Sequence, residues 1–500
     1  MPPSESGDSR VVDVVVIGAG PAAEVAAARL AATGLDVVAV EAHLVGGECS
    51  YYACIPSKAL LRPGAAVEAA LAVDGARQAV TGTVDTAAAL ARRTRFTSGW
   101  SDEGQAAWLA ENRVGLVRGW GRLAGPRVVE VGDARLHARH AVVVATGTTA
   151  LLPPVPGLAD AAPWTNREAT RADAAPRRLV VMGGGPVACE LATAWRSLGT
   201  EEVTVVEQAD RLLARVEPFA AEAVRAGLEA RGIAVRTGAR VVRVDRPAAG
   251  GPVRVAVTSA AGGEGGDAGG EGGEGDARED VIEADELLVA AGRRPATGDL
   301  GVEVVGLEPG RPLATDDSGR VAGVDGGWLW AVGDVTGSAL LTHMGKYEGR
   351  ACAAAIVAGI RGADAAAGAA APPWSPTVAT ARTRAVTQVI YTRPEVAVVG
   401  LTEAEARAAG VTVRTVRVAI DVAGATLHAD DYTGTVQLVV DDDRRVVVGA
   451  TFVGPEVGEM LHSATIAVVG EVPLDRLWHA VPAFPSVSEV WLRLLETYGL

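Results

Sequence analysis

Apolar and polar positions along the chain follow one another in blocks that predict strands and helices in a fixed order. Residues 11–17 form a short aliphatic run, and a turn at residues 18–23 leads into an alanine-rich stretch that extends to about Thr33. A second apolar run covers residues 36–40 and ends at Glu41. Short continuous apolar runs are typical of strands buried on both faces, and strands that alternate with helices predict a parallel sheet. The first block is therefore expected to be a βαβ unit.

A second block repeats this design later in the chain. Residues 179–182 form its first apolar run, and a glycine turn at residues 183–188 opens a helical pattern that extends to about Leu198. A further apolar run at residues 203–206 ends before Glu207. The repeat predicts a second βαβ unit of the same kind.

A third pattern begins after Pro372 and Pro373. Valine and threonine alternate with other residues near 387–390, 435–440 and 446–453, and helical patterns follow. Alternation with a period of two predicts antiparallel strands. The C-terminal part is therefore expected to combine an antiparallel sheet with helices.

Length and composition agree with several α/β domains. At roughly 150 residues per domain, 500 residues predict about three domains. Hydrophobic residues make up 49% of the chain and aromatic residues only 4%, so aliphatic side chains must form the cores. Residues 259–280 consist mostly of Gly, Glu and Asp, which bury almost nothing, and predict a disordered loop within the second block.

Charge, hydropathy and cysteine content exclude several classes of protein. The 46 basic and 61 acidic residues give a net charge of −15, which argues against nucleic acid as a partner. No apolar run reaches the roughly 18 residues of a membrane span, and the polar start lacks the apolar core of a signal peptide, so we expect a cytoplasmic protein with no membrane partner. Four cysteines are too few for a structural disulfide framework. A close pair among them is more typical of a catalytic or metal site.

The two glycine turns are candidate dinucleotide sites. A glycine turn after a strand lets the backbone approach a pyrophosphate at a helix N-terminus, and an acid at the end of the next strand binds ribose hydroxyls. Alanine, a permitted variant, replaces the third glycine in both copies. Two ordinary tight turns are the alternative. The candidate residues are Gly18, Gly20, Ala23 and Glu41 in the first block, and Gly183, Gly185, Ala188 and Glu207 in the second.

The second acid also bears on the choice of nucleotide. Glu207 favours NADH over NADPH, because a carboxylate repels a 2′-phosphate. Arg211, four residues further on, leaves NADPH as an alternative.

Cys49 and Cys54 form a close pair directly after the first ribose acid. In a regular helix five residues rise about 7.5 Å, beyond the roughly 7 Å allowed between the Cα atoms of a disulfide. A bridge therefore needs a distorted helix entrance, which the preceding glycines and Pro56 could supply. A helix entrance can also lower a thiol pKa from about 8.5 toward neutrality. Two inert core cysteines are the alternative, and no metal site is expected because no further ligands complete a tetrahedron around zinc.

The chain contains only two lysines, Lys58 and Lys346, and uses arginine elsewhere. A compact ammonium rather than a guanidinium fork is therefore expected to matter at these positions. For Lys346 an incidental surface position is an equal alternative.

These features together resemble the class I pyridine nucleotide-disulfide oxidoreductases, the family of dihydrolipoamide dehydrogenase, glutathione reductase and mercuric reductase. The resemblance extends from Val11 to Glu496. The resemblance includes the two glycine turns and residues 46–58, which contain the cysteine pair and are called the redox run below. Its other motifs are residues 145–147, 291–295, 332–334, 391–395 and 449–459.

The resemblance implies an α/β fold with two Rossmann-like dinucleotide-binding domains and a C-terminal α+β dimerisation domain. The FAD-binding domain is then expected at residues 1–160 and 285–371, and the NAD(P)-binding domain at residues 161–284. Residues 372–500 are expected to form the dimerisation domain of a homodimer.

The same resemblance implies roles for individual residues. Asp334 contacts the ribityl-phosphate region of FAD, Gly121 and Gly147 line the flavin nucleotide, and Lys58 pairs with Glu190 beside the flavin ring. Further implied cofactor positions are Gly47, Thr146, Gly333 and Gly292. Electrons are expected to pass from NADH to FAD and then to a Cys49–Cys54 disulfide. Cys54 faces the flavin, and Cys49 attacks a small-molecule acceptor.

The sequence departs from the family at its expected acid-base group. Members that act on small disulfides carry a C-terminal His-Pro-Thr-x-x-Glu motif, in which the partner subunit's histidine serves the interchange thiol. Here Phe484 replaces that histidine and Glu489 retains the acid. His479 is a candidate substitute, although a surface histidine is the more natural interpretation.

The redox run departs from the family as well. Tyr51 and Tyr52 replace small and amide residues, and Glu48 replaces threonine. The tyrosines either reshape the substrate mouth for a flat or aromatic acceptor or pack against Trp100 or Trp108. Cys189 and Cys352 lie in alanine-rich helices and are interpreted as buried apolar residues. No second cysteine pair follows near residue 500, which argues against mercuric reductase and the large thioredoxin reductases as close matches.

Three functions remain open. The first is an FAD-dependent NAD(P)H oxidoreductase, similar to dihydrolipoyl dehydrogenase, with an active disulfide and a non-standard acceptor. The second is a quinone or metal-ion reductase that works directly from flavin or from the Cys54 thiolate, which needs no histidine. The third is a non-catalytic flavoprotein subunit of a larger complex.

Overall fold

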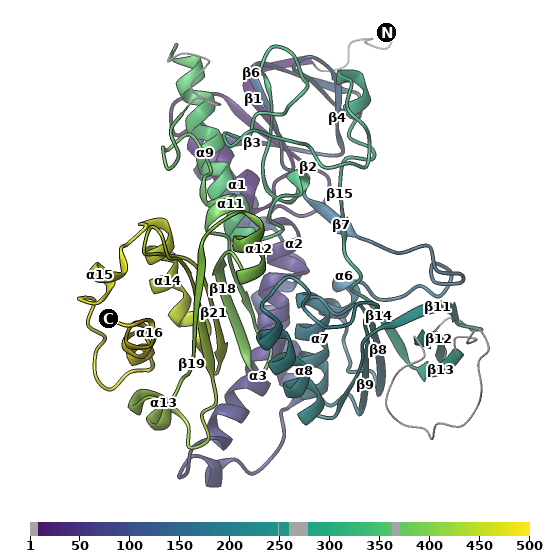
Figure 1. Ribbon diagram of the computed structural model, residues 1–500. Coiled ribbons are helices and arrows are strands. Elements are labelled where there is room, and N and C mark those ends of the chain that lie inside the picture. The colour runs from purple at the N-terminus through teal and green to yellow at the C-terminus, as the bar shows by residue number, and fades with distance from the viewer. Residues whose placement is uncertain (1–8, 249, 260–278, 363–370) are drawn as a thin grey trace, which may run out of the picture. The chain divides into compact units, whose positions relative to one another are not determined.

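The computed structural model describes residues 9–248, 250–259, 279–362 and 371–500, and divides into two compact units (Figure 1). Unit 1 contains residues 1–55, 94–149 and 293–386, and unit 2 contains residues 56–93, 150–292 and 387–500. Most of the predicted disordered loop lies outside the described residues. These units end at other positions than the predicted domains and do not test them. The predicted domain boundaries therefore stay a prediction.

Unit 1 is built on a seven-stranded sheet in the order β3-β2-β1-β6-β5-β4, with β16 beside β6. β1 is parallel to β2 and β6, while β5 is antiparallel to both of its neighbours, β4 and β6. The strands of this sheet are β1 (Ser9–Ile17), β2 (Val37–Glu41), β3 (Val114–Arg118), β4 (Gly121–Gly125), β5 (Val128–Val131), β6 (Ala134–Val144) and β16 (Leu329–Ala331).

Two helices of unit 1, α1 (Pro21–Ala31) and α9 (Thr342–Ile360), pack side by side (Figure 1). Small residues permit this approach, since a Cβ atom on Gly349 would lie 2.6 Å from the carbonyl oxygen of Ala22. The other helical and short strand elements of this part of the chain are α2 (Gly47–Tyr51), η2 (Ser98–Trp100), α5 (Glu103–Glu111), β7 (Thr148–Ala150), β15 (Arg293–Pro295), η3 (Val302–Val305), η4 (Gly333–Thr336) and α11 (Ala381–Arg384).

Unit 2 contains a four-stranded parallel sheet in the order β10-β9-β8-β14 and a three-stranded antiparallel sheet, β11-β12-β13. The elements are β8 (Arg178–Met182), α7 (Pro186–Ser197), β9 (Glu202–Val206), α8 (Pro218–Ala230), β10 (Ile233–Arg236), β11 (Ala239–Asp245), β12 (Val253–Ser259), β13 (Glu279–Ala284) and β14 (Glu286–Val289). Helices α3 (Cys54–Leu71), η1 (Arg77–Ala79), α4 (Thr86–Phe96) and α6 (Asn166–Arg171) precede them.

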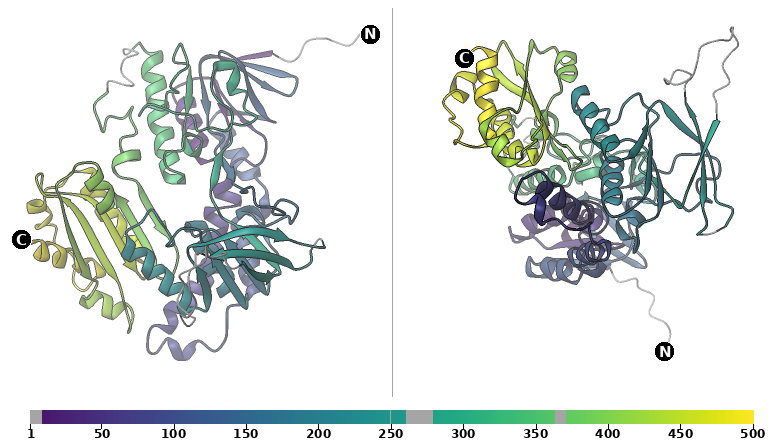
Figure 2. Two further views of the ribbon diagram at one scale, coloured as in Figure 1. Left: turned by 45° about the vertical axis from the view of Figure 1, so that its right-hand side comes forward. Right: turned by 90° about the horizontal axis from the view of Figure 1, so that it is seen from below.

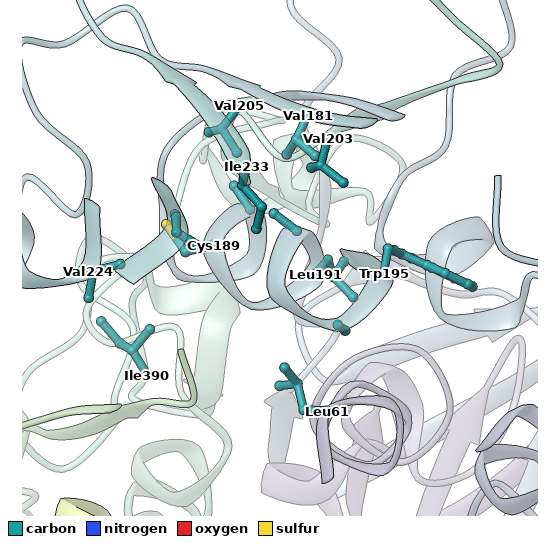
Figure 3. Close-up of a cluster of buried hydrophobic side chains, with 14 of the residues drawn as sticks. Leu61, Val181, Cys189, Leu191, Trp195, Val203, Val205, Val224, Ile233 and Ile390 are labelled. Carbon is teal, nitrogen blue, oxygen red and sulfur yellow. The ribbon is translucent and has the colours of Figure 1, made fainter. Parts of the chain in front are cut away.

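The core of unit 2 joins α7 to the parallel sheet. Figure 3 shows Cys189, Leu191 and Trp195 of α7 among valine side chains of β8 and β9. Cys189 is fully buried, as is Cys352 in unit 1. The prediction that both are buried apolar residues is therefore confirmed.

The C-terminal part of unit 2 is an antiparallel sheet in the order β17-β18-β21-β20-β19. Helices α14 and α16 lie against this sheet, as the green and yellow ribbons of Figure 2 show. The elements are β17 (Thr387–Ile390), β18 (Glu395–Gly400), α12 (Glu403–Ala408), β19 (Val413–Ala419), α13 (Ala423–His428), β20 (Thr435–Asp441), β21 (Val446–Gly454), η5 (Val457–Met460), α14 (Leu461–Val469), α15 (Leu474–Leu477), η6 (Val487–Glu489) and α16 (Val490–Tyr498).

The predicted fold class is confirmed. Both βαβ units form, each with a parallel strand pair around its glycine turn, and the C-terminal strands pair antiparallel. Across the described segments, we find no helix that has both the length and the apolar character required to cross a membrane.

Candidate functional site

The first glycine turn connects β1 to α1 in a form that only small residues allow. Gly18 has a φ of 100°, and a Cβ atom on it would lie 2.4 Å from the carbonyl oxygen of Ala145. Gly20 caps α1, and a Cβ on it would meet nothing within 4 Å. Gly47 packs against Gly20, with 3.1 Å between its Cβ position and the Gly20 Cα. The turn therefore leaves open space at the start of α1, as a bound pyrophosphate requires.

The acid that ends β2 is held by the backbone. The Glu41 carboxylate accepts hydrogen bonds of 2.8 Å from the N–H groups of Ala19 and His43. These bonds fix both oxygens beside the glycine turn, and each oxygen keeps a further lone pair for a ribose hydroxyl.

The second turn reproduces this arrangement in unit 2. Gly183 has a φ of 113°, a Cβ on it would lie 2.5 Å from the carbonyl oxygen of Ala290, and a Cβ on Gly185 would meet nothing within 4 Å. The Glu207 carboxylate accepts hydrogen bonds from the N–H groups of Gly184 and Ala209. The two turns thus share one geometry.

The other predicted positions of the first site lie in unit 1. Thr146 donates a 3.0 Å hydrogen bond to the carbonyl oxygen of Ala296. Asp334 is mostly buried and accepts a 3.2 Å hydrogen bond from Thr148, and burial raises the pKa of its carboxyl group. The remaining positions are Ala23, buried in α1; Gly121, in contact with Ile17 and Val40; Gly147, with a φ of 70°; and Gly333, with a φ of 77°.

Two further predicted positions belong to unit 2. Ala188 is buried at the start of α7. Gly292 has a φ of 131°, and its carbonyl oxygen accepts a hydrogen bond from the N–H of Leu151.

Cys49 and Cys54 lie in different helices, as a bridge between them requires. Cys49 belongs to the short helix α2, and Cys54 begins α3. The interruption falls at Tyr52 and Ala53, rather than at the preceding glycines or at Pro56, which continues inside α3. Both cysteines are thiols in this structure.

The two thiols form hydrogen bonds with each other and with Thr342, the first residue of α9. The Sγ of Cys54 lies 3.2 Å from the Oγ1 of Thr342. A side-chain hydrogen bond with Cys54, together with burial, raises the pKa of Cys49, and Thr342 and Lys346 oppose this shift. The direction is opposite to the effect that a helix entrance would have on Cys49, because the hydrogen bond to Cys54 favours the protonated form of Cys49 and burial disfavours its thiolate.

Glu48, which replaces the family's threonine, takes part in a charged network. Arg293 reaches Glu48 over 3.4 Å and donates a 2.6 Å hydrogen bond to the Oγ1 of Thr148. Since Thr148 also donates to Asp334, the two carboxylates are linked through one guanidinium and one hydroxyl. Arg293 thus compensates the acid that this chain adds to the redox run.

The tyrosines of the redox run differ in exposure. Tyr51 is 1% exposed, and its hydroxyl donates a 2.6 Å hydrogen bond to Gln105. Burial, followed by the charges of Asp102 and Glu24, raises the pKa of Tyr51 to about 12. The indole of Trp100 donates a hydrogen bond to the backbone carbonyl oxygen of Tyr51. The burial of Tyr51 favours the packing alternative for this residue. Tyr52 is only partly buried.

Lys58 and Glu190 form the predicted pair within unit 2. Their side chains lie 2.6 Å apart, and the Glu190 side chain is buried. The Lys58 ammonium also lies 5.0 Å from the ring centre of Tyr391, whose N–H donates a 3.0 Å hydrogen bond to Glu190. The carboxylate is thereby fixed from both sides.

The C-terminal segment leaves Phe484 exposed on the single chain. Its side chain is 77% exposed, and His479 is also exposed. Within the part of the chain that the structure describes, Oε2 of Glu489 is buried and has no hydrogen-bond partner. The acid that orients a histidine in the family therefore stands without one in unit 2.

Several residues at these sites were missed by the sequence analysis. Thr342 touches the redox thiols, and Glu348 accepts a 2.7 Å hydrogen bond from the N–H of Gly333. A Cβ on Gly424 would lie 2.1 Å from the carbonyl carbon of Ser486, so a glycine is needed where α13 passes the Phe484 segment. No local pattern marks these residues, although Thr342 closely follows the Val332–Asp334 motif.

Comparison with known proteins agrees with this geometry. The family model described as pyridine nucleotide-disulphide oxidoreductase matches residues 12–359, and the dimerisation domain of the same family matches residues 386–494. The chain belongs to the pyridine nucleotide-disulphide oxidoreductase family.

Relatives cover nearly the whole chain. Dihydrolipoyl dehydrogenase of Thermus scotoductus is 32% identical over 496 residues and covers 97% of both chains. Mercuric reductase of Lysinibacillus sphaericus is 28% identical and covers 95% of this chain and 81% of its own. Among solved structures, a Cu(II) complex of the HOCl-induced flavoprotein disulfide reductase RclA from Escherichia coli superposes with a TM-score of 0.77 at 21% identity, covering 97% of this chain and 99% of that one.

Family membership settles the general class. The chain is a flavoprotein disulfide oxidoreductase with FAD and a pyridine nucleotide as cofactors and its redox cysteines in the Cys49–Cys54 region. Its dimerisation domain implies a homodimer.

Proposed function

We propose that the protein passes electrons from NADH through bound FAD to a Cys49–Cys54 disulfide, and from Cys49 to a small-molecule acceptor that needs little proton transfer from the protein. A quinone, a metal ion or an activated disulfide meets this requirement. The observation that carries the proposal is the combination of an exposed Phe484 with a Glu489 carboxylate that lacks a histidine to orient.

The missing imidazole matters because of the size of its usual contribution. General acid-base assistance is typically worth about 10² to 10⁴ in rate. A phenyl ring can neither accept nor donate a proton, and Glu489 lies in η6 five residues further on. Oxidation of a dithiol such as dihydrolipoamide, which must lose a proton before attack, is therefore expected to be slow.

The residues of unit 1 fit the FAD that the family implies. Gly18, Gly20 and Gly47 would receive the pyrophosphate, Glu41 would bind the ribose, and Asp334 would face the ribityl-phosphate region. When bound, FAD supplies a two-electron relay between the nucleotide and the disulfide. The family resemblance assigns the Lys58 ammonium, which Glu190 holds within unit 2, to the flavin ring.

The contacts of Arg211 support NADH as the donor. Its guanidinium donates hydrogen bonds of 2.9 Å and 2.7 Å to the carbonyl oxygens of Val216 and Ala214. Because these bonds hold Arg211, Glu207 remains the charge that faces the ribose, and a 2′-phosphate would be repelled.

The test is to restore the histidine with Phe484→His. Turnover of dihydrolipoamide should rise by about 10²-fold, while anaerobic reduction of the enzyme by NADH stays unchanged. Phe96→His, at another exposed phenylalanine, is the matched control and should change neither rate. Fast dithiol turnover in the unmodified protein would contradict the proposal.

A second candidate is direct reduction of a quinone or metal ion by flavin or by the Cys54 thiolate. The raised pKa of Cys49 favours it, because a protonated thiol is a poor nucleophile. The mercuric reductases among the relatives bear the name of a metal-ion substrate. Cys49→Ser distinguishes the candidates, since direct transfer should survive it and transfer through the disulfide should not. Failure to oxidise NADH with any acceptor would contradict both and leave a non-catalytic subunit.

A further inference from the structure

The second lysine of the chain has no role in the function proposed above. Lys58 forms a 2.6 Å ion pair, whereas Lys346 makes no ion pair within 4.0 Å among the residues that the structure describes. Lys346 is half-buried in α9, a helix whose other cationic side chain, Arg350, is exposed. A half-buried ammonium without an ion pair needs a reason, because burial alone disfavours its charge.

Helix geometry places Lys346 near the redox thiols. Thr342 begins α9, and its hydroxyl lies 3.2 Å from the Sγ of Cys54. Residues four positions apart lie on the same face of a helix. Lys346 therefore lies on the same face of α9 as Thr342, one turn further toward the C-terminus. The charge of Lys346 accordingly acts on Cys49, where it lowers the thiol pKa against the effect of burial.

A carboxylate on the neighbouring helix acts on the same ammonium. Close contacts of Gly345 and Gly349 with Ala22 bring α1 against α9. Glu24 follows two residues later on α1, and burial raises its pKa while Lys346 opposes the rise. The charge of Lys346 therefore acts on both Cys49 and Glu24, although the ammonium and the Glu24 carboxylate are too far apart to form an ion pair.

The other charged groups around the pair are accounted for. Cys54 shares the hydrogen bond with Cys49, and Glu48 reaches Arg293. Burial raises the pKa of Tyr51 to about 12, so its hydroxyl carries no charge near neutral pH. His343 is exposed on α9 next to Thr342. Lys346 is thus the cation that acts on Cys49 from α9.

We propose that Lys346 is a positioning residue that stabilises the thiolate of Cys49 after the disulfide is reduced, and that Glu24 limits this effect. The inference rests on the proposed function, in which Cys49 attacks the acceptor. Reduction breaks the S–S bond with the two electrons of the hydride that NADH supplies. The hydride also accounts for one proton of the dithiol, and solvent supplies the second proton when both sulfurs are protonated. Lys346 changes only the fraction of Cys49 that is unprotonated. It thereby offsets part of what the absent histidine would provide.

The experiment measures the reactivity of Cys49 directly. The full-length protein with bound FAD is reduced with dithiothreitol, transferred to buffers of different pH without reductant, and treated with iodoacetamide. Mass spectrometry then gives the alkylation rate of Cys49 alone. Lys346→Met should raise the pH midpoint by about one unit and slow alkylation at pH 7 about tenfold. Lys346→Arg should retain the original profile, because it keeps the charge.

Two further variants keep the test decisive. Glu24→Gln should shift the midpoint in the opposite direction, because it removes the countercharge of Lys346. Arg350→Met, which removes a cation one turn further along α9, should leave the profile unchanged. Equal profiles for Lys346→Met and the unmodified protein, or shifts of the same sign for Lys346→Met and Glu24→Gln, would overturn the inference. Because alkylation needs no turnover, these results are distinct from a failure of the proposed function, which Cys49→Ser reports.

Discussion

At the scale of single residues, the two nucleotide sites repeat one electrostatic device. Glu41 is the last residue of β2, and Glu207 directly follows β9. Each carboxylate accepts hydrogen bonds from two backbone N–H groups beside a glycine turn. Charge-assisted hydrogen bonds of this kind are stronger than neutral ones, so they fix each carboxylate firmly. The repeat makes each acid a natural control for the other.

Glu207→Gln is expected to weaken the preference for NADH. The amide can still accept from a ribose hydroxyl but no longer repels a 2′-phosphate, so the ratio of kcat/KM for NADPH to that for NADH should rise about tenfold, or roughly 1.4 kcal/mol. Steady-state kinetics with both nucleotides measures this ratio. Glu41→Gln should weaken FAD retention, but it should not change the ratio of kcat/KM for NADPH to that for NADH. A preference for NADPH in the unmodified protein would contradict the assignment.

At the scale of elements, the close packing of α1 and α9 positions the residues around the redox thiols. α1 begins at the first glycine turn, and α9 begins at Thr342 beside Cys54. Gly345 and Gly349 of α9 both approach Ala22, which no larger side chain would allow. The separation of these helices therefore depends on residues that have no chemical role of their own.

Gly349→Ala is expected to destabilise this pair of helices. Its Cβ would lie 2.6 Å from a backbone oxygen, and overpacking typically costs about 1–3 kcal/mol, which corresponds to a fall in Tm of roughly 2–12 °C. Gly359→Ala in the same helix is the control, since its Cβ meets nothing within 4 Å and alanine favours helices. Differential scanning fluorimetry gives both values. Equal Tm values for the two variants would show that the helices separate at little cost.

Local pattern predicted the elements well and their long-range contacts poorly. The apolar run at residues 387–390 is β17, and the runs near 435–440 and 446–453 are β20 and β21, because period-two alternation follows directly from the pleat. The rise of a regular helix correctly predicted a break between Cys49 and Cys54. The break lies at residues 52–53, however, and not at the preceding glycines or at Pro56. The contact of Thr342 with Cys54 joins residues 288 positions apart, and its origin lies in the packing of α1 on α9 rather than in any local period.

At the scale of the whole molecule, the dimerisation domain implies that a second copy covers part of unit 2. Exposed apolar side chains gather in its C-terminal part, where Leu427 is 72%, Ile466 57% and Val481 84% exposed. Phe484 lies three residues after Val481 and is 77% exposed. Apolar groups of this size are normally covered in a stable protein, and a partner subunit would cover them here.

Val481→Asp and Ile466→Asp are therefore expected to convert the dimer into a monomer. An unpaired carboxylate buried in an interface costs several kcal/mol, so the dissociation constant of the dimer should rise by about 100-fold or more. Light scattering on a dilution series gives the mass directly. Val304→Asp introduces the same charge at a 49% exposed valine of unit 1, outside the dimerisation domain, and should leave the mass unchanged. If Val481→Asp and Ile466→Asp keep the mass of the unmodified dimer, as the control does, the interface lies elsewhere. Phe484 would then not lie at the contact with a partner subunit.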